Sequence, residues 1–358
     1  DKTLINSPRY LANAGYQMLC AYLHDPNDPG FSVLQAKAAK KGVELISVAD
    51  HGATDWRVVP RMLEVCRKYR VNVWHAHDYK TNALGLVLKR FWPMRLLTTL
   101  HGWVHHTGRT PLYYFIDRAS LRWYEKVISV SDDLVKSSRL AGVPSARCFL
   151  LENGIDLNDY RRQRTPAQAR TALGLDPARL TIGAAGRLSA EKGFDLLIRS
   201  AARLIGSGAN VQLLIAGEGV EAPALQRLIA ELGQTERIQL LGYRSDLTAL
   251  YEAFDVYALS SYREGLPNVL LEAMAMEVPI VSTAVNGIPR LLQHRDNGML
   301  VQPCSVDELT TALQQLLTDA TLRQTLAAAA RRTVETRYSF AVRMDKLAKL
   351  YDTMHLGR

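Results

Sequence analysis

The sequence predicts an α/β protein built from two successive, doubly wound parallel-sheet domains. Short apolar runs recur along the 358 residues, and a helical pattern follows each of them, which is the alternation typical of parallel sheets. The chain is longer than an ordinary single domain. Its apolar content of 47% with 22% charged residues is typical of a soluble globular protein. Two Rossmann-like domains of ordinary size are therefore expected.

The apolar runs are the expected strands. In the first half they are residues 17–23, 43–48, 71–77, 95–101, 126–130 and 148–151. The second half repeats the rhythm with TIGAAGRL, VQLLIAG, RIQLLGY, DVYALSS and PIVSTAV. The segment 159–170, DYRRQRTPAQAR, is polar and basic and contains a proline, so it is the expected linker.

Composition limits the possible environments and partners. No stretch has the roughly 18 consecutive apolar residues of a membrane-spanning helix, and the start, DKTLINSPRY, lacks a signal-peptide core, so a cytoplasmic protein is expected. The four cysteines are scattered, which favours free thiols. Residues 1–165 contain 24 lysines and arginines against 15 acids, whereas the remainder balances. This asymmetry indicates an anionic partner for the first half, or simply a solvated basic surface.

A basic loop follows the strand segment TIGAAG. It reads GRLSAEKG over residues 186–193 and places Arg187 and Lys192 five positions apart, just before a helix. Two cations at the positive end of a helix can bind an anion such as a diphosphate. The loop matches neither a Walker motif nor GxGxxG, so a kinase or dehydrogenase has no support.

A second junction, EGLPNVLLEAM over residues 264–274, follows the strand segment DVYALSS. Glu264 is expected in the loop, Pro267 in the first helical turn, and Glu272 one to two turns inside the helix. Free amides over 266–270 and two carboxylates can together bind an oxygen-rich ligand. Either acid alone would be an ordinary exposed glutamate, but the nearby basic loop favours a phosphate- and hydroxyl-binding site.

These motifs resemble the signature of the family-4 retaining glycosyltransferases, whose GT-B fold has two Rossmann-like domains facing across a cleft. Glu264 and Glu272 match the family's E-x7-E pattern. Further blocks lie in family order along nearly the whole chain: HAHD at 75–78, TLHG at 99–102, ISVSDDL at 128–134, ENGID at 152–156, AGEG at 216–219 and NGI at 286–288.

The resemblance implies an N-terminal acceptor-side domain over 1–160, a nucleotide-sugar domain over 161–337, and a C-terminal helix over 338–358 that packs back on the first domain. It implies that Arg187 and Lys192 bind the diphosphate and that Glu272 binds the ribose. The backbone of residues 243–244 would contact the base, and the donor sugar would lie near Glu264 and His101. The implied catalytic residues are His101, Arg187, Lys192 and Glu264. The implied donor-binding residues are Gly186, Arg187, Lys192, Gly217, Tyr243, Arg244, Glu264, Gly265, Leu266, Pro267, Asn268, Val269 and Glu272, and the acceptor side has His77, Asp78 and His101.

The expected reaction is retaining transfer of a sugar, from a UDP-sugar by family frequency, to a glycan or lipid-linked acceptor. In the front-face route that the family favours, the leaving phosphate helps to deprotonate the acceptor, and cations stabilise its growing charge. The sequence contains no Asp-x-Asp triplet, so we expect metal-independent transfer without a cofactor. A metal site at His75, His77, Asp78 and His101 is the less favoured interpretation.

Several alternatives stay open. The chain could be a catalytically silent nucleotide- or glycan-binding protein, or a GDP-mannose-dependent mannosyltransferase. The segment KRFWPMR at 89–95 is either a membrane-surface patch or, as we favour, a helix end with Trp92 partly buried. An anionic membrane, at the inner face of the plasma membrane, is a possible partner of the basic domain, and no nucleic acid is expected. The first strand and glycine-rich loop of the family are expected to be missing from the sequence, either because it is a fragment of a longer protein or because this edge of the fold is altered. A true absence favours the silent alternative.

Overall fold

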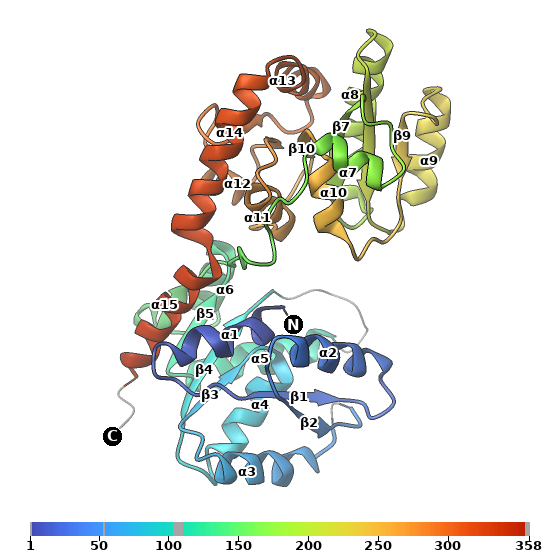
Figure 1. Ribbon diagram of the computed structural model, residues 1–358. Coiled ribbons are helices and arrows are strands. Elements are labelled where there is room, and N and C mark those ends of the chain that lie inside the picture. Colours follow the sequence, from blue (N-terminus) through green and yellow to red (C-terminus); the bar gives the residue numbers. More distant parts are fainter. Residues whose placement is uncertain (1, 53, 103–109, 355–358) are drawn as a thin grey trace. The chain divides into compact units, whose positions relative to one another are not determined.

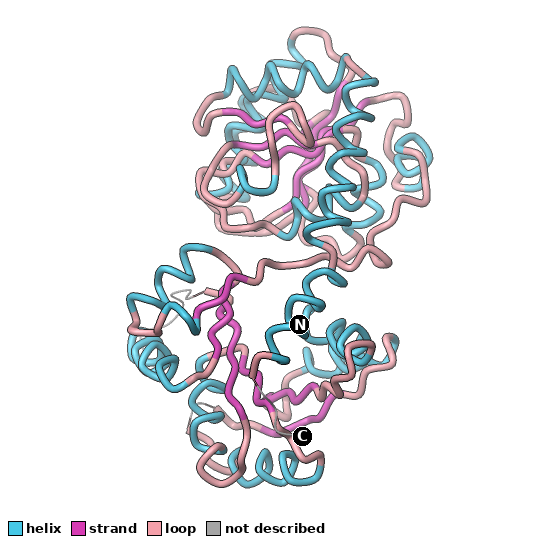
Figure 2. The backbone as a smooth tube through the Cα atoms, turned by 90° about the vertical axis from the view of Figure 1, so that its left-hand side faces the viewer, coloured by secondary structure: helices cyan, strands magenta, loops and turns pink. Residues whose placement is uncertain are grey.

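The computed structural model describes residues 2–52, 54–102 and 110–354 of the chain, which divides into two compact units. Unit 1 comprises Asp1–Glu152 with Ala341–Arg358, and unit 2 comprises Asn153–Phe340 (Figure 1). Each unit is a layered α/β assembly in which helices flank parallel strands (Figure 2). Within the described ranges, no helix has the length and apolarity needed to cross a membrane.

The described strands of unit 1 form two parallel sheets, β1-β2 and β3-β4-β5-β6. The strands are β1 (Cys20–His24), β2 (Leu45–Ala49), β3 (Val73–Ala76), β4 (Arg95–Leu100), β5 (Lys126–Ser129) and β6 (Cys148–Leu150). Helix α1 (Lys2–Ala12) precedes β1, and the helices between the strands are α2 (Pro29–Lys40), α3 (Val58–Lys68), α4 (Tyr79–Leu88), α5 (Thr110–Ser120) and α6 (Asp132–Leu140), with the short 3-10 turns η1 (Leu121–Trp123) and η2 (Ser145–Arg147).

Unit 1 buries a core between its sheets and helices. Helix α3 is amphipathic: Val58, Met62 and Cys66 recur every four residues and are all buried. They pack in one cluster with strand residues such as Leu96 and Val127, which are fully buried. The apolar periodicity of the sequence thus corresponds to the inward faces of these elements.

Unit 2 contains one parallel sheet in the order β12-β11-β10-β7-β8-β9. Its strands are β7 (Leu180–Ala185), β8 (Val211–Ala216), β9 (Ile238–Leu240), β10 (Val256–Leu259), β11 (Ile280–Thr283) and β12 (Met299–Val301). The helices are α7 (Pro166–Ala172), α8 (Phe194–Gly206), α9 (Ala222–Glu231), α10 (Leu247–Ala253), α11 (Asn268–Ala275), α12 (Ile288–Leu291), α13 (Val306–Thr318) and α14 (Ala320–Thr333), with the 3-10 turn η3 (Ala190–Lys192) and the π-helix η4 (Val334–Tyr338). Helix α15 (Phe340–Asp352) follows in the sequence.

The strand order of unit 2 reverses between β7 and β10. From β7 the chain adds β8 and β9 on one side, and it then returns to add β10, β11 and β12 on the other. Loops that leave neighbouring strands at such a switch point diverge, and ligands of open parallel sheets bind between them. The two loops in question are residues 186–193 and 260–267, which contain the motifs singled out in the sequence.

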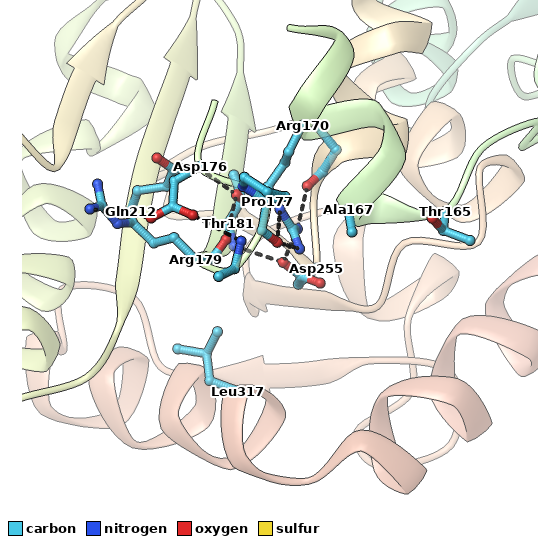
Figure 3. Close-up of polar contacts among 12 residues, drawn as sticks. Thr165, Ala167, Arg170, Asp176, Pro177, Arg179, Thr181, Gln212, Asp255 and Leu317 are labelled. Atoms are coloured by element: carbon cyan, nitrogen blue, oxygen red, sulfur yellow. Dashed lines mark hydrogen bonds and ion pairs between the residues drawn. The ribbon is translucent and has the colours of Figure 1, made fainter. Parts of the chain in front are cut away.

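A buried ion pair fastens α7 to the amino ends of the central strands β7 and β10 (Figure 3). Arg170 Nη1 lies 2.6 Å from Asp255 Oδ2, which also accepts the backbone N–H of Thr181 at 2.8 Å. Arg170 also donates to the carbonyls of Pro177 and Ala253. The segment 159–170, which we expected to be a linker, therefore packs within unit 2.

Most of helix α15 belongs to unit 1 although it follows unit 2 in the sequence. Its Tyr351 hydroxyl lies 2.8 Å from His75 Nδ1, and its ring meets the Tyr16 ring edge-on at 5.2 Å. Arg343 Nε donates to the carbonyl of Glu152 at 3.1 Å. These contacts place the side chains of α15 beside β3 and the end of β6.

Candidate functional site

The basic loop of unit 2 turns its two cations in different directions. Arg187 is exposed and forms an ion pair with Glu191, at 3.0 Å between Nη2 and Oε1. Lys192, at the end of η3, is mostly buried, and its ammonium lies 2.6 Å from Glu264 Oε1 in the neighbouring loop. Lys192 is therefore the cation that links the loops after β7 and β10.

Glu264 is buried and its carboxylate is firmly held. Besides the Lys192 ammonium, its Oε1 accepts the Ser261 hydroxyl at 2.7 Å. A phosphate oxygen could compete with Glu264 for the ammonium, and sugar hydroxyls could donate to the carboxylate. The pair thus places one positive and one negative side chain at the switch point of the sheet.

Backbone hydrogen bonds join the loops of unit 2 to one another. The N–H of Leu188 donates to the carbonyl of Glu218 in the loop after β8, at 2.8 Å. The N–H of Tyr262 donates to the carbonyl of Glu191 at 2.8 Å, which ties the loop after β10 to the basic loop. The loops therefore support one another, which is the rigidity that a binding site needs.

Two glycines permit these close approaches. Gly217 has φ +145°, and a Cβ there would lie 1.8 Å from the carbonyl oxygen of Gly186. Gly193 has φ +58°, and a Cβ there would lie 2.3 Å from the carbonyl oxygen of Ser260. Any other residue at either position would be strained and would push two loops apart.

Helix α11 begins at Asn268, and Pro267 is its N-cap in an extended conformation. Pro267 therefore precedes the first turn, whereas the sequence placed it inside that turn. Helix geometry leaves the N–H groups of Asn268 and Val269 without an intrahelical acceptor. The N–H of Leu270 instead donates to the carbonyl of Pro267 at 3.1 Å, so the expected run of free amides is shorter by this residue.

Glu272 is buried inside α11 and is held by two tyrosines. Its Oε1 accepts the Tyr160 hydroxyl at 2.8 Å, and its Oε2 accepts the Tyr251 hydroxyl at 3.1 Å. Burial raises the pKa of Tyr251 well above its usual value, which keeps that hydroxyl protonated as a donor. Sequence reasoning missed both tyrosines because they lie outside every motif, 112 and 21 residues away from Glu272.

Tyr243 and Arg244 lie in the loop after β9. The Tyr243 side chain is 73% exposed, and its backbone N–H is 3.3 Å from Glu218 Oε1. Arg244 turns back on Asp246 through two hydrogen bonds, of 2.8 and 2.6 Å, which lower the pKa of that carboxyl. Tyr243 is therefore the more accessible of the two side chains.

In unit 1, adjacent strands bring three histidines together. His77 and His101 directly follow the paired strands β3 and β4, with Nδ1 of His77 3.1 Å from Nε2 of His101. The His75 and His77 rings stack at 4.4 Å. Burial removes water from these rings, and nearby positive charges disfavour a further one. Together they lower the pKa of His77 to about 3 and that of His101 to about 4. Both imidazoles are thus neutral at pH 7.

Asp78 lies next to this cluster but has a structural task. It is the N-cap of α4, and its Oδ1 accepts the N–H of Thr81 at 2.8 Å in a capping box. Across the described residues, no three His, Cys, Asp or Glu side chains are arranged to hold a metal ion. The loop HAHD thus provides one imidazole, that of His77, next to His101.

Two family models match the chain, and together they cover most of it. "Glycosyltransferase Family 4" matches residues 4–159, and "Glycosyl transferases group 1" matches residues 167–333. The chain belongs to glycosyltransferase family 4. The boundary between the two matches falls within the 159–170 segment that packs on unit 2.

Solved structures place this family-4 chain in the GT-B fold. The crystal structure of Anabaena Alr3699/HepE in complex with UDP-glucose superposes with a TM-score of 0.78 at 21% identity, covering 98% of this chain and 95% of that one. The prediction of a GT-B fold with two parallel-sheet α/β domains is confirmed. The superposition covers both units, although the sequences differ at most positions.

Curated relatives of this family-4 chain act on different molecules, by their names. Alpha-D-kanosaminyltransferase of Streptomyces kanamyceticus is 30% identical over 246 residues, which are 67% of this chain and 64% of that protein. The chain thus spans just under two thirds of that relative. N-acetyl-alpha-D-glucosaminyl L-malate synthase of Bacillus anthracis is 25% identical over 317 residues, covering 87% of this chain and 82% of that protein.

Proposed function

We propose that this protein transfers a sugar from a nucleotide sugar to an acceptor hydroxyl, with retention of the anomeric configuration. The observation that carries this proposal is the meeting of Lys192, Glu264 and the start of α11 at the switch point of unit 2. Unit 2 is then the donor unit, and unit 1 is the acceptor-side unit. Family membership supports the reaction class.

Under this proposal, the cations and amides act on the leaving group. Cleavage of the glycosyl phosphate bond builds negative charge on the diphosphate, and Arg187, Lys192 and the N–H groups that begin α11 stabilise that charge. The leaving phosphate itself takes the proton of the acceptor in the front-face route. Glu264 orients the donor sugar through its hydroxyls, Glu272 binds the ribose, and His101 contacts the sugar. A glycosyl adduct trapped on Glu264 would contradict this assignment.

The donor that we propose is a UDP-sugar, and a GDP-sugar is the alternative. The solved GT-B neighbour described above was crystallised with UDP-glucose, which supports the first choice. A thermal-shift panel of UDP-, GDP- and ADP-sugars tests it, because a ligand at 100 times its Kd stabilises the folded state by about 2.7 kcal/mol. The UDP-sugars should raise Tm selectively. If no nucleotide sugar raises Tm, the proposed function fails; if they bind without donor hydrolysis or transfer, the protein is a silent binder.

We also propose that transfer is independent of metal ions. The reason is the lack of an Asp-x-Asp triplet in the sequence, together with the cations and amides that can stand in for a metal on the diphosphate. Activity should survive exhaustive treatment with EDTA. Loss of activity that added Mg²⁺ or Mn²⁺ restores would refute this part.

The acceptor that we propose is a glycan or lipid-linked saccharide, met by a cytoplasmic protein at an anionic membrane surface. Support comes from three exposed apolar side chains of unit 1: Phe91 and Trp123, each 62% exposed, and Leu140, 88% exposed. Contacts join residues that are close to them in the sequence: Lys89 pairs with Glu125, and Arg122 donates to the carbonyl of Ala141. Aromatic and basic groups mixed in this way favour the interface of anionic lipids.

Vesicle sedimentation tests this surface. The protein should bind vesicles with anionic lipid and not neutral ones, and the triple variant Lys89→Gln, Arg90→Gln, Arg95→Gln should bind them less. The matched triple variant Arg227→Gln, Arg237→Gln, Arg332→Gln, in unit 2, should bind as the parent does. If the two triple variants bind anionic vesicles equally well, Lys89, Arg90 and Arg95 do not form a membrane-binding surface.

A further inference from the structure

Tyr160 lies between β6 and α7, far in the sequence from every motif, and its hydroxyl is bonded to Glu272. The tyrosine is buried and packs in the apolar cluster that also contains Tyr251, Leu270 and Leu271. Its hydroxyl donates to Glu272 Oε1 at 2.8 Å. A hydrogen bond to a carboxylate is charge-assisted, and such bonds are stronger than those between neutral groups. The Tyr160 hydroxyl therefore restrains one of the two oxygens of this buried carboxylate.

The backbone of Tyr160 is anchored to the helix that carries Glu272. Arg331 of α14 donates from Nη1 to the carbonyl of Tyr160 at 2.9 Å, and the same nitrogen donates to the carbonyl of Ala275, at the end of α11. Its Nε pairs with Glu335 at 2.7 Å, which restrains the guanidinium. Tyr160 and α11 are thus bound to the same guanidinium. This arrangement fixes the position of the tyrosine relative to the glutamate.

The second tyrosine on Glu272 shares its hydroxyl with another acceptor. The Tyr251 hydroxyl lies 3.1 Å from Glu272 Oε2 and also 3.1 Å from the backbone carbonyl of Val269. A phenol has a single proton, so Tyr251 divides its donation between these two oxygens. The shorter contact from Tyr160 is therefore the stronger of the two constraints on the carboxylate.

The two tyrosines leave the carboxylate able to bind a ligand. Each carboxylate oxygen can accept two hydrogen bonds, so one hydroxyl on each oxygen does not saturate Glu272. The residue is 6% exposed, so part of it still meets solvent. Ordering a side chain at the moment of binding lowers affinity, and a carboxylate that is already held avoids this loss. A glutamate fixed in this way suits a ligand with hydroxyl groups.

We propose that Tyr160 is a positioning residue for the nucleotide ribose, because its hydroxyl fixes the Glu272 carboxylate in the orientation that receives the ribose hydroxyls. The inference rests on the proposed function in one respect, that Glu272 binds the ribose of the donor. It adds that discrimination between ribose and 2′-deoxyribose depends on Tyr160, which acts through Glu272 and not on the substrate. Tyr251 supports the same carboxylate more weakly.

Calorimetry with two matched nucleotides tests this role. UDP and 2′-deoxyuridine diphosphate are titrated separately into the full chain, and the ratio of their two Kd values is the readout. The nucleotides share the base and the diphosphate, so a loss of folded protein or a weaker diphosphate site affects both Kd values alike and cancels in the ratio. The parent should bind UDP about tenfold or more tightly than the deoxynucleotide, because a hydrogen bond to a charged group is lost with the 2′-hydroxyl.

Two variants of the carboxylate and its partner carry the test. Tyr160→Phe should reduce the ratio to about threefold or less while UDP still binds, and Glu272→Gln should reduce it at least as far. Tyr160→Phe added to Glu272→Gln should change the ratio no further, because two residues that act through one contact are not additive. Tyr160→Phe keeps the aromatic ring and its apolar packing, and circular dichroism checks that the variant is folded.

Tyr257→Phe is the matched control. Tyr257 is a buried tyrosine of the same apolar cluster, and its hydroxyl donates to the carbonyl of Ala185 at 3.2 Å. Its loss should lower stability and leave the ratio of the parent unchanged. Tyr251→Phe should lower the ratio less than Tyr160→Phe does, and a larger fall would overturn the assignment to Tyr160.

The remaining outcomes separate this inference from the proposed function. An unchanged ratio in Tyr160→Phe, or an equal fall in Tyr257→Phe, would overturn the positioning role. Equal binding of both nucleotides by the parent would overturn it as well, although transfer from a UDP-sugar would still support the proposed function. If no nucleotide binds the parent, the proposed function fails and this inference fails with it.

Discussion

Lys192 and Glu264 are 72 positions apart in the sequence and form one ion pair. Each neutralises the charge of the other where two loops meet, and both are largely buried. A diphosphate that approaches Lys192 is attracted by the ammonium and repelled by the carboxylate. The two residues should therefore have opposite effects on nucleotide binding.

Substitution of the two residues tests this opposition. Glu264→Gln should bind UDP at least as tightly as the parent, because a repulsive charge is removed, while transfer falls by about 10²–10³-fold. Lys192→Met should lose about tenfold or more in UDP affinity as well as in transfer, because a charge-assisted hydrogen bond is lost. Calorimetry and initial rates measure both quantities, and Glu231→Gln, an exposed acid of unit 2, serves as control. Weaker UDP binding by Glu264→Gln would contradict the expected repulsion.

Single residues also show where sequence reasoning stops. The positions of Arg187, Lys192, Glu264 and Glu272 relative to strands and helices could be predicted, because loops at the ends of parallel strands follow from the apolar pattern. The hydrogen bonds from Tyr160 and Tyr251 to Glu272 could not be predicted, because such contacts depend on packing between distant segments of the chain. The same holds for Arg343, which lies in a helix that no motif marks.

Among the elements, the strands that lie in clear apolar runs were predictable, including the three-residue strands β6 and β9. The expected runs overlap every strand from β1 to β11, because each is flanked by polar turns. Strand β12 was missed because its apolar run is only the three residues Met299–Val301, between Gly298 and Gln302. Ser305 caps α13, because its hydroxyl accepts the N–H of Glu308, while the Glu308 carboxylate accepts the N–H of Gln302.

The ion pair Arg170–Asp255 gives α7 a measurable role in stability. Arg170→Met leaves Asp255 buried without a countercharge, and breaking a buried pair in this way costs about 3–5 kcal/mol. Arg203→Met removes an exposed pair with Asp307 and should cost about 0–1 kcal/mol. Urea unfolding followed by circular dichroism compares the two variants. Similar losses in both would mean that Arg170 does not anchor α7.

At the scale of the whole molecule, the two units can be followed separately. All five tryptophans of the sequence lie within residues 1–152, so tryptophan fluorescence reports on unit 1 alone. The basic excess of the sequence and the histidine cluster also belong to this unit. Its stability should therefore depend on pH in a way that fluorescence detects.

The direction of this dependence follows from the lowered pKa of His77. The folded-state pKa of about 3 lies below the ordinary value of 6.5, so between these values the unfolded chain binds the additional proton. The free energy of unfolding should thus fall by about 1.4 kcal/mol per pH unit for His77 as the pH drops below 6.5, until the folded state also protonates near pH 3. His101 acts in the same direction.

Urea titrations monitored by tryptophan fluorescence at pH 7.5 and 5.5 measure this slope. His77→Gln should flatten it, whereas His51→Gln, an exposed residue of the same unit, should leave it unchanged. An equal slope in parent and His77→Gln would show that His77 does not couple folding to protonation.

The return of α15 to unit 1 has a consequence for the order in which the protein is made. Unit 2 is continuous in sequence, whereas unit 1 consists of two separated segments. A ribosome therefore releases all of unit 2 before it supplies the helix that carries Arg343 and Tyr351. During synthesis the later unit can fold first, and the histidine cluster of the earlier one stays incomplete until α15 emerges.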